Sequence, residues 1–253
     1  MLTQLEYRFN FFTDAVLQPI ITCMIEISMW WAIFANSGLE QIGGFGRESY
    51  LAYAIWASFV ARISSNWMYE FRMVNEIDSG SVNSLLVRPI SFYEYYLSQF
   101  LGYKFMTTAV SLLVPIAAMA LVDLPFHWQR LPATLALIGY YLIFVHTLSF
   151  CVASLAFFWN RTHSFTVAKN FIVWILSGEI IPLDLLPAGI KPMILNLPFC
   201  NGVFIPVGYL TGRVGSDGLM HGFVTTTVGI VGMSFLARIM WIRGREVYSG
   251  TGA

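Results

Sequence analysis

Six apolar stretches separated by shorter polar segments run along the chain. The core of a bilayer needs about 20 apolar residues per helix, and lipid offers backbone groups no hydrogen-bond partner, so each stretch predicts a membrane-spanning helix. The second stretch is the least regular, because Arg62 lies inside it. The predicted fold class is therefore all-α, a polytopic membrane protein with six transmembrane helices near residues 15–34, 50–66, 97–122, 132–159, 165–181 and 219–242.

The residues before the first stretch have a helical pattern of their own. Leu2, Leu5, Phe9 and Phe12 recur at helical spacing and predict an N-terminal amphipathic helix in the membrane interface; a frayed tail is the alternative. This region mixes charged groups with aromatics and has no small-residue cleavage site, so we expect no removable signal peptide.

The composition agrees with a membrane environment. Hydrophobic residues make up 57% of the 253 residues and charged residues only 11%, against about 25% in a soluble domain. The 14 basic and 14 acidic side chains balance, and no basic patch indicates nucleic-acid binding. Neither an internal repeat nor a flexible linker divides the chain, so we expect a single transmembrane domain over residues 1–253.

Basic residues predict the orientation, because the cytoplasmic flanks of membrane spans hold the excess of Lys and Arg. With the amino terminus inside, most basic residues fall on the cytosolic side, and an even number of spans returns the chain to that side. We therefore expect both termini in the cytosol. The cytosolic set is Arg8, Arg62, Arg72, Arg88, Lys104, Arg161, Lys169, Arg238, Arg243 and Arg245, and the outer set is Arg47, Arg130, Lys191 and Arg213.

The longest polar interruption, residues 75–90, lies between the second and third stretches. It begins with acidic residues, which favour a helix start, passes a Gly-Ser break and ends at an Arg-Pro pair, which disfavours further helix. The pattern is typical of a short helix that protrudes into the cytosol and docks on a partner ATPase; a solvated loop is the alternative. The candidate ATPase-coupling residues are Asn75, Glu76, Ile77, Asp78, Gly80, Leu85, Arg88 and Pro89.

Residues 76–90 resemble the stretch of ABC-2 type permeases in which an Ile, a Gly and a Leu-x-x-Pro-Ile-like ending follow the second span. Residues 42–45, followed by 50–53, are similar to the first external loop of an ABC-2 subfamily of bacterial exporters. Residues 245–252 are similar to its short aromatic and glycine-rich tail. With their shared order and the six spans, these segments extend the resemblance over nearly the whole chain.

The resemblance implies a permease subunit of an ATP-driven exporter in the bacterial cytoplasmic (inner) membrane. Such a subunit pairs with a second permease, identical or similar, and with two copies of a cytosolic ABC ATP-binding subunit. The chain has no Gly-x-x-x-x-Gly-Lys-Ser/Thr phosphate loop, so we do not expect it to be an enzyme on its own. We expect no cofactor in this chain, with ATP and Mg²⁺ bound by the partner subunit.

Prolines interrupt the segment after the fifth stretch. Pro182, Pro187, Pro192, Pro198 and Pro206 cannot sit in one straight helix and predict several short pieces. Their mixed polarity indicates that these pieces dip back into the outer membrane face, where protein must cover the backbone. ABC-2 permeases have short re-entrant outer helices at this place, so the resemblance implies an outer gate; a plain external loop is the alternative.

Several side chains are candidates for a translocation path or gate. Glu26 lies mid-span, where a charge costs several kcal/mol; it faces a path, or it is protonated or hydrogen-bonded between helices. Trp30 is also explained as an interfacial anchor. Arg62 and Lys104 are expected to extend to the inner interface. By resemblance, the first, second and fifth spans line the cavity, and the path or gate candidates are Glu26, Trp30, Phe171, Trp174, Glu179, Pro182, Asp184 and Pro187.

Other classes of function stay open beside the exporter. An ion-gradient-driven secondary transporter would use Glu26, Glu179 and Asp184 as ion sites, but it predicts inverted repeats, which the sequence lacks. A non-transporting membrane scaffold is the third class. The cargo of an exporter would be a lipid, peptide, drug or glycoconjugate. No HExxH or Gly-x-Ser-x-Gly motif supports catalysis by the histidines, which are His127, His146, His163 and His221.

Overall fold

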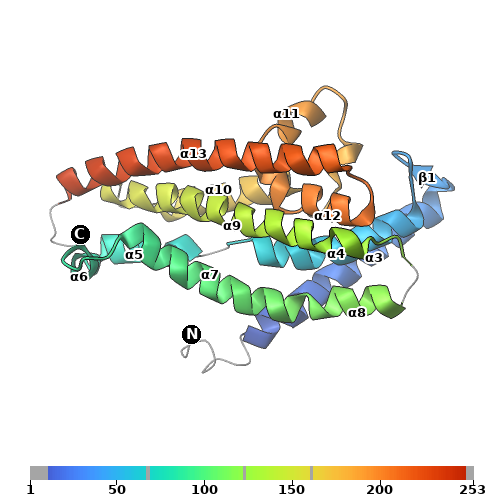
Figure 1. Cartoon of the computed structure of the whole chain (residues 1–253), viewed down its shortest axis with the longest axis horizontal. Coiled ribbons are helices and arrows are strands. Elements are labelled where there is room, and N and C mark those ends of the chain that lie inside the picture. The colour runs from blue at the N-terminus through green and yellow to red at the C-terminus, as the bar shows by residue number, and fades with distance from the viewer. Residues whose placement is uncertain (1–10, 67–68, 122–123, 160–161, 249–253) are drawn as a thin grey trace.

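The computed structural model describes residues 11–66, 69–121, 124–159 and 162–248, which are almost entirely helical, as predicted. The long helices run side by side along the longest axis of the molecule (Figure 1). Within the described residues, strands occur only in one small antiparallel hairpin. With η for a π-helix or 3-10 helix, the elements are η1 (Thr13–Leu17), α3 (Gln18–Ser37), β1 (Gln41–Ile42), β2 (Phe45–Gly46), α4 (Arg47–Ser64), α5 (Tyr69–Asp78), α6 (Asn83–Leu86), α7 (Phe92–Ser111), α8 (Leu113–Leu121), η2 (Trp128–Arg130), α9 (Leu131–Ser154), η3 (Leu155–Phe157), α10 (His163–Ser177), η4 (Leu183–Leu185), α11 (Lys191–Leu195), η5 (Pro198–Gly202), α12 (Phe204–Thr211) and α13 (Ser216–Val247).

Four helical segments of the described chain are long and apolar enough to cross a membrane. They coincide with the first, third, fourth and sixth predicted spans. The second and fifth predicted spans correspond to α4, which is 18 residues long, and α10, which is 15 residues long. The total of six spans therefore stays a prediction. The four long segments are Thr13–Ser37, Phe92–Leu121, Trp128–Phe157 and Ser216–Val247.

Helix α10 ends earlier than the sequence predicts. The predicted span extends to the apolar pair Ile180 and Ile181, but the helix stops at Ser177 because Gly178 takes a left-handed conformation with φ of 79°. Glycine adopts this C-terminal conformation without the strain that a Cβ would bring. The stop also serves packing, since a Cβ at Gly178 would lie 2.8 Å from the Cβ of Phe204.

Helix α9 lies at the centre of the bundle. Of the 18-residue apolar stretch in the span that contains α9, 61% is buried inside the protein, whereas only 17% is buried in the first and last spans. Helix α13 packs closely on α9 through small residues: a Cβ at Gly222 or Gly229 would come within 3.2 Å of Leu137 or 3.0 Å of Phe144, respectively. Glycines allow such close approach between membrane helices. The outer surfaces of α3 and α13 are left free for lipid or for other subunits.

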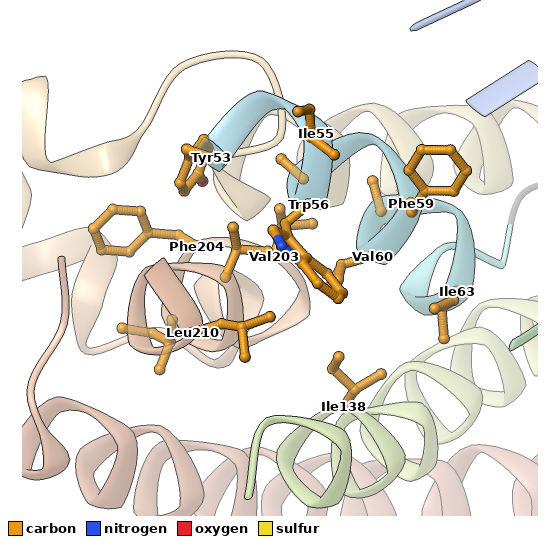
Figure 2. Packing of buried hydrophobic residues seen from close by; sticks show 14 of the residues in the cluster. Tyr53, Ile55, Trp56, Phe59, Val60, Ile63, Ile138, Val203, Phe204 and Leu210 are labelled. Carbon is orange, nitrogen blue, oxygen red and sulfur yellow. The ribbon is translucent and has the colours of Figure 1, made fainter. Parts of the chain in front are cut away.

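A large hydrophobic cluster connects α4 with α9 and α12 (Figure 2). Trp56 is fully buried at its centre and stacks on Phe126, with ring centroids 5.0 Å apart. The cluster explains why α4 is almost wholly buried despite its modest apolar length. Its labelled members are Tyr53, Ile55, Trp56, Phe59, Val60 and Ile63 of α4, Ile138 of α9, and Val203, Phe204 and Leu210 in and before α12.

The proline-rich segment forms short helices, as predicted. Pro192 stands in the first turn of α11, and Pro198 begins η5. Proline is tolerated at these positions because the first helical N–H groups have no intrahelical partner. Nearly every residue of α12 is buried by α4, α9 and α13, so protein covers its backbone. How deeply these helices enter the bilayer stays a prediction.

Two predicted features fall partly on residues outside the described ranges. The interfacial helix was predicted from residues 2–12, of which only 11 and 12 are described. The aromatic and glycine-rich tail was assigned to residues 245–252, of which 245–248 are described.

Candidate functional site

The coupling segment is a helix-turn-helix rather than an irregular loop. Helix α5 is followed by a turn at Gly80, whose φ is 77°, and by the short helix α6. The N–H of Val82 donates to the carbonyl of Glu76 over 2.8 Å, which fixes the angle between the two helices. Ile77 and Leu85 are buried against the rest of the protein, whereas Val87 is 84% exposed on the surface. The segment thus has an apolar anchor and an apolar outer surface.

The anchor of this segment is a cluster shared with three other helices. Ile77, Val82 and Leu85 belong to it, together with side chains from the ends of α7, α9 and α13. The rings of Phe92 and Trp241 stack with centroids 4.9 Å apart. Helix α6 accordingly lies at the same end of the molecule as the C-terminal end of α13 (Figure 1).

The predicted coupling residues are distributed over both faces of this segment. Asn75 is exposed, Glu76 and Asp78 are half-buried, and Arg88 and Pro89 follow α6 in the exposed stretch. Glu76 forms an ion pair with Arg72 one turn earlier, at 3.3 Å. Burial raises the pKa of Asp78, and the positive charge of His163 opposes this shift.

A cavity of about 800 Å³ opens between the helices. Side chains from η1, α3, α4, α5, α7 and α10 line it. The first, second and fifth predicted spans contribute, as the resemblance implies, and α7 adds a fourth wall. Of the predicted path residues, Phe171, Trp174 and Glu179 lie in the wall.

Charged groups from three helices meet in the cavity wall. The guanidinium of Arg62 pairs with the carboxylate of Asp14, which also accepts a hydrogen bond from the hydroxyl of Tyr103. The ammonium of Lys104 donates to the carbonyl of Arg62 over 3.1 Å. Lys104 is only 4% exposed, so the expectation that it extends to the inner interface does not hold. Instead, the Lys104 side chain ends inside the bundle, at the carbonyl of Arg62 near the C-terminal end of α4.

A second polar group, almost fully buried, connects α10 with α5 and α9. The ammonium of Lys169 lies 2.5 Å from Oε1 of Glu70 and donates to Oδ1 of Asn66 over 3.0 Å and to Oγ of Ser149 over 3.2 Å. Apart from this ion-pair contact, the carboxylate of Glu70 has no hydrogen-bond partner within the described ranges. The arrangement fixes the cavity-lining helix α10 to the helix that carries the coupling segment.

Two predicted path residues of α3 are not among the side chains that line the cavity. Glu26 is buried behind the wall, where it interacts with Ser58 and Glu179, which do line the cavity. Trp30 is buried against Tyr50, with ring centroids 4.2 Å apart. The neighbouring Trp31 is exposed and lies beneath Arg47, which suits an interfacial anchor better than Trp30 does.

A buried ion pair joins several elements beside the β-hairpin. Arg213 is fully buried, and its guanidinium donates to Oδ2 of Asp184 over 2.7 Å. The rings of Phe45 and Tyr50 flank the guanidinium carbon at 4.2 and 4.1 Å from their centroids. These residues join the hairpin, α4, η4 and the turn after α12. Asp184 is therefore held in this cluster, whereas Pro182 is buried beside it and Pro187 is exposed.

The comparison with known families agrees with this architecture. The model of the family described as "ABC-2 family transporter protein" matches residues 20–252. The chain belongs to the ABC-2 transporter family. No curated protein matches the chain, and no solved structure does. As an ABC-2 family protein it is a multi-pass membrane component of ABC transport, a type that is generally not catalytic itself and typically works with ABC ATP-binding subunits.

The histidines of this ABC-2 chain are dispersed. His146 is buried and lies within hydrogen-bond distance of the Tyr69 hydroxyl and of the Tyr93 carbonyl, at 3.3 and 3.2 Å. It thus connects helices, as expected for a lone histidine in a membrane. Among the described residues, no group of three His, Cys, Asp or Glu side chains could hold a metal ion.

Sequence reasoning missed several residues that join the elements of this ABC-2 protein. Lys169, Glu70 and Arg213 were noted only as charges or not at all, and Asn201 was not singled out. Nδ2 of Asn201 is within 3.1 Å of three acceptors on α13, including the hydroxyl of Thr226 at 2.9 Å. For the three charged residues, the available signal was an ionisable side chain inside or near a predicted span, where it must find a partner; no such signal marked Asn201.

Proposed function

We propose that this chain is the membrane-spanning permease subunit of an ATP-driven exporter, and that it forms the translocation pathway as a dimer coupled to separate ATP-binding subunits. The coupling segment supports this proposal most strongly. Its outer surface exposes Leu86, Val87 and Ile90, at an end of the molecule where polar residues surround them. Exposed apolar side chains on a fixed support favour docking of a partner protein.

A connected path leads from this segment to the cavity. Movement of α6 is passed to α5 through the turn at Gly80 and the buried anchor residues. Helix α5 is joined to α10 by the Lys169–Glu70 ion pair, and α10 supplies Phe171 and Trp174 to the cavity wall. ATP-driven closure of the partner subunits would thereby change the shape of the cavity.

The partner permease, identical or similar, is proposed to cover the exposed side of α10. Phe171, Ile172 and Ile175 are each at least half exposed there, although they belong to a helix only 15 residues long. We further propose that the whole chain is a single transmembrane domain of the bacterial cytoplasmic (inner) membrane, with both termini in the cytosol. Basic residues support this orientation, since Arg238, Arg243 and Arg245 lie at the α6 end of α13. ATP and Mg²⁺ belong to the partner, and the outward direction follows the family resemblance.

The test alters the outer surface without disturbing the anchor. Val87→Glu places a charge on the docking surface, whereas Val247→Glu places the same charge on an exposed valine at the end of α13 and serves as a control. The first variant should lose copurification of an ATP-binding subunit and ATP hydrolysis by the complex, at normal membrane insertion. The control should keep both. Full hydrolysis with Val87→Glu would remove the coupling assignment.

Two further variants test the segment as a lever. Glu76→Arg replaces the ion pair with Arg72 by a like-charge contact, and Leu85→Pro interrupts α6. Both should abolish ATP hydrolysis that depends on the permease, while insertion stays intact. A secondary transporter or a scaffold would show neither the bound ATPase nor this sensitivity, so the same measurement separates the three classes.

A further inference from the structure

The cavity wall contains a buried cation without a counter-anion. The ammonium of Lys104 donates to the Arg62 carbonyl, but no carboxylate of the described residues lies within 4.0 Å of it. Beside it, Nε of Arg62 is buried and has no hydrogen-bond partner among the residues that the structure describes. Buried charges and donors are normally paired, because an unpaired one loses its hydration without compensation. Two donors in one wall are therefore left for a ligand.

The acidic residues of the wall are already engaged. Asp14 accepts from both Arg62 and the Tyr103 hydroxyl, so its charge is balanced by Arg62. Glu179 interacts with the side chain of Trp174 and with the charge of Arg62. The remaining basic residue in the wall, Arg72, pairs with Glu76 outside it. Among the described residues, no carboxylate therefore forms an ion pair with the ammonium of Lys104 itself.

The rest of the wall is suited to an apolar group. Phe100, Tyr141, Phe171 and Trp174 all line the cavity. The ammonium of Lys104 lies 5.7 Å from the ring centroid of Phe100, so the charged and aromatic parts of the wall adjoin. A volume of about 800 Å³ can hold an organic molecule rather than a small ion alone.

We propose that the cavity binds an amphiphilic anion, with the anionic group at Lys104 and Arg62 and the apolar part against the aromatic side chains of α7 and α10. This inference rests on the proposed function and specifies the chemical class of the transported molecule. The anionic group satisfies the orphan donors, and the apolar part gains by leaving water.

Three soluble probes test the class. Hexyl phosphate carries both features, inorganic phosphate carries only the anion, and hexylammonium carries only the alkyl chain, with the opposite charge. Their binding to the full chain in phosphatidylcholine nanodiscs is measured by calorimetry. Hexyl phosphate should bind at least about tenfold more tightly than either other probe. Equal binding of hexylammonium would overturn the proposal, and equal binding of inorganic phosphate would overturn its amphiphilic part.

Variants locate the site. Lys104→Met keeps the length of the side chain but removes its charge, and it should weaken hexyl phosphate binding about tenfold, whereas Lys104→Arg should keep most of it. Lys191→Met, a cation of α11 outside the cavity wall, is the control and should bind as the wild type does. Unchanged binding by Lys104→Met would overturn the assignment. If that variant does not fold, the three-probe comparison on the wild type still decides.

The coupling variants separate this inference from the function on which it rests. Val87 is not among the side chains that line the cavity, so Val87→Glu should keep wild-type hexyl phosphate binding while losing its ATPase partner. A wild-type chain that selects hexyl phosphate but binds no ATP-binding subunit would overturn the exporter proposal and keep the anion site. A chain that drives ATP hydrolysis without selecting hexyl phosphate would overturn the anion site alone.

Discussion

Replacing Lys169 by methionine is expected to destabilise the protein strongly, because the substitution leaves a buried carboxylate without its counter-charge. Lys169 is 7% exposed and Glu70 is fully buried, and they lie 2.5 Å apart. Methionine has a similar length and fills most of the same space. The change therefore isolates the loss of charge from the loss of packing.

The size of the effect follows from burial. Removing one partner of a buried ion pair lowers the free energy of unfolding by about 3–5 kcal/mol. The exposed pair of Arg72 and Glu76, whose side chains are 59% and 22% accessible, is an internal comparison. Exposed pairs contribute about 0.2–1 kcal/mol, so Arg72→Met should change the free energy of unfolding by less than about 1 kcal/mol.

The assay is equilibrium unfolding in mixed micelles, followed by tryptophan fluorescence of the full chain. A double variant, Lys169→Met with Glu70→Leu, removes both charges and should recover most of the loss. It should stay about 1–2 kcal/mol below wild type, because Asn66 and Ser149 still lose the donor that Lys169 provides. Equal losses from Lys169→Met and Arg72→Met would refute the reasoning, as would a double variant no more stable than the single one.

Three other variants test the buried Arg213–Asp184 ion pair, the end of α10 and α3. Asp184→Asn removes the charge that faces the fully buried Arg213 and should lower the free energy of unfolding by about 3 kcal/mol in the same assay, with recovery on adding Arg213→Met. Gly178→Ala forces a Cβ onto a backbone with φ of 79° and should destabilise by more than about 1 kcal/mol, whereas Gly189→Ala, with open space around it, should not. Glu26→Gln keeps the shape of a buried carboxyl that interacts with Ser58 and Glu179 of the cavity wall, so it should leave expression unchanged and alter ATP hydrolysis by the complex; unaltered hydrolysis would assign Glu26 a structural role.

Apolar length predicted the long helices well, because a membrane span must supply its own backbone hydrogen bonds. Proline positions likewise predicted the short helices after α10, since proline removes a donor wherever it stands in a helix. The end of α10 was misplaced, because the apolar pair Ile180 and Ile181 extended the predicted span beyond Gly178, where the chain turns. Hydropathy and proline positions therefore predict which helices form, but they misplace the residues at which a helix ends.

Hydropathy and proline positions could not predict which distant residues pair with each other. Lys169 and Glu70 are 99 positions apart, and nothing in the spacing of either shows that the two meet. The same holds for Arg213, which was assigned to the outer side but is enclosed by two aromatic rings. Each was visible only as a charge near a predicted span, which indicates that a partner exists but not which residue it is.

The close packing of α13 on α9 has a consequence for biosynthesis. The ribosome makes α9, the most buried span of the bundle, well before it makes α13. The glycines of α13 pack against Leu137 and Phe144 of α9. Until translation reaches residue 247, that central helix has one flank open to lipid. Assembly of the tertiary structure therefore waits for α13, and a chain that stops short of α13 inserts its helices without completing their packing.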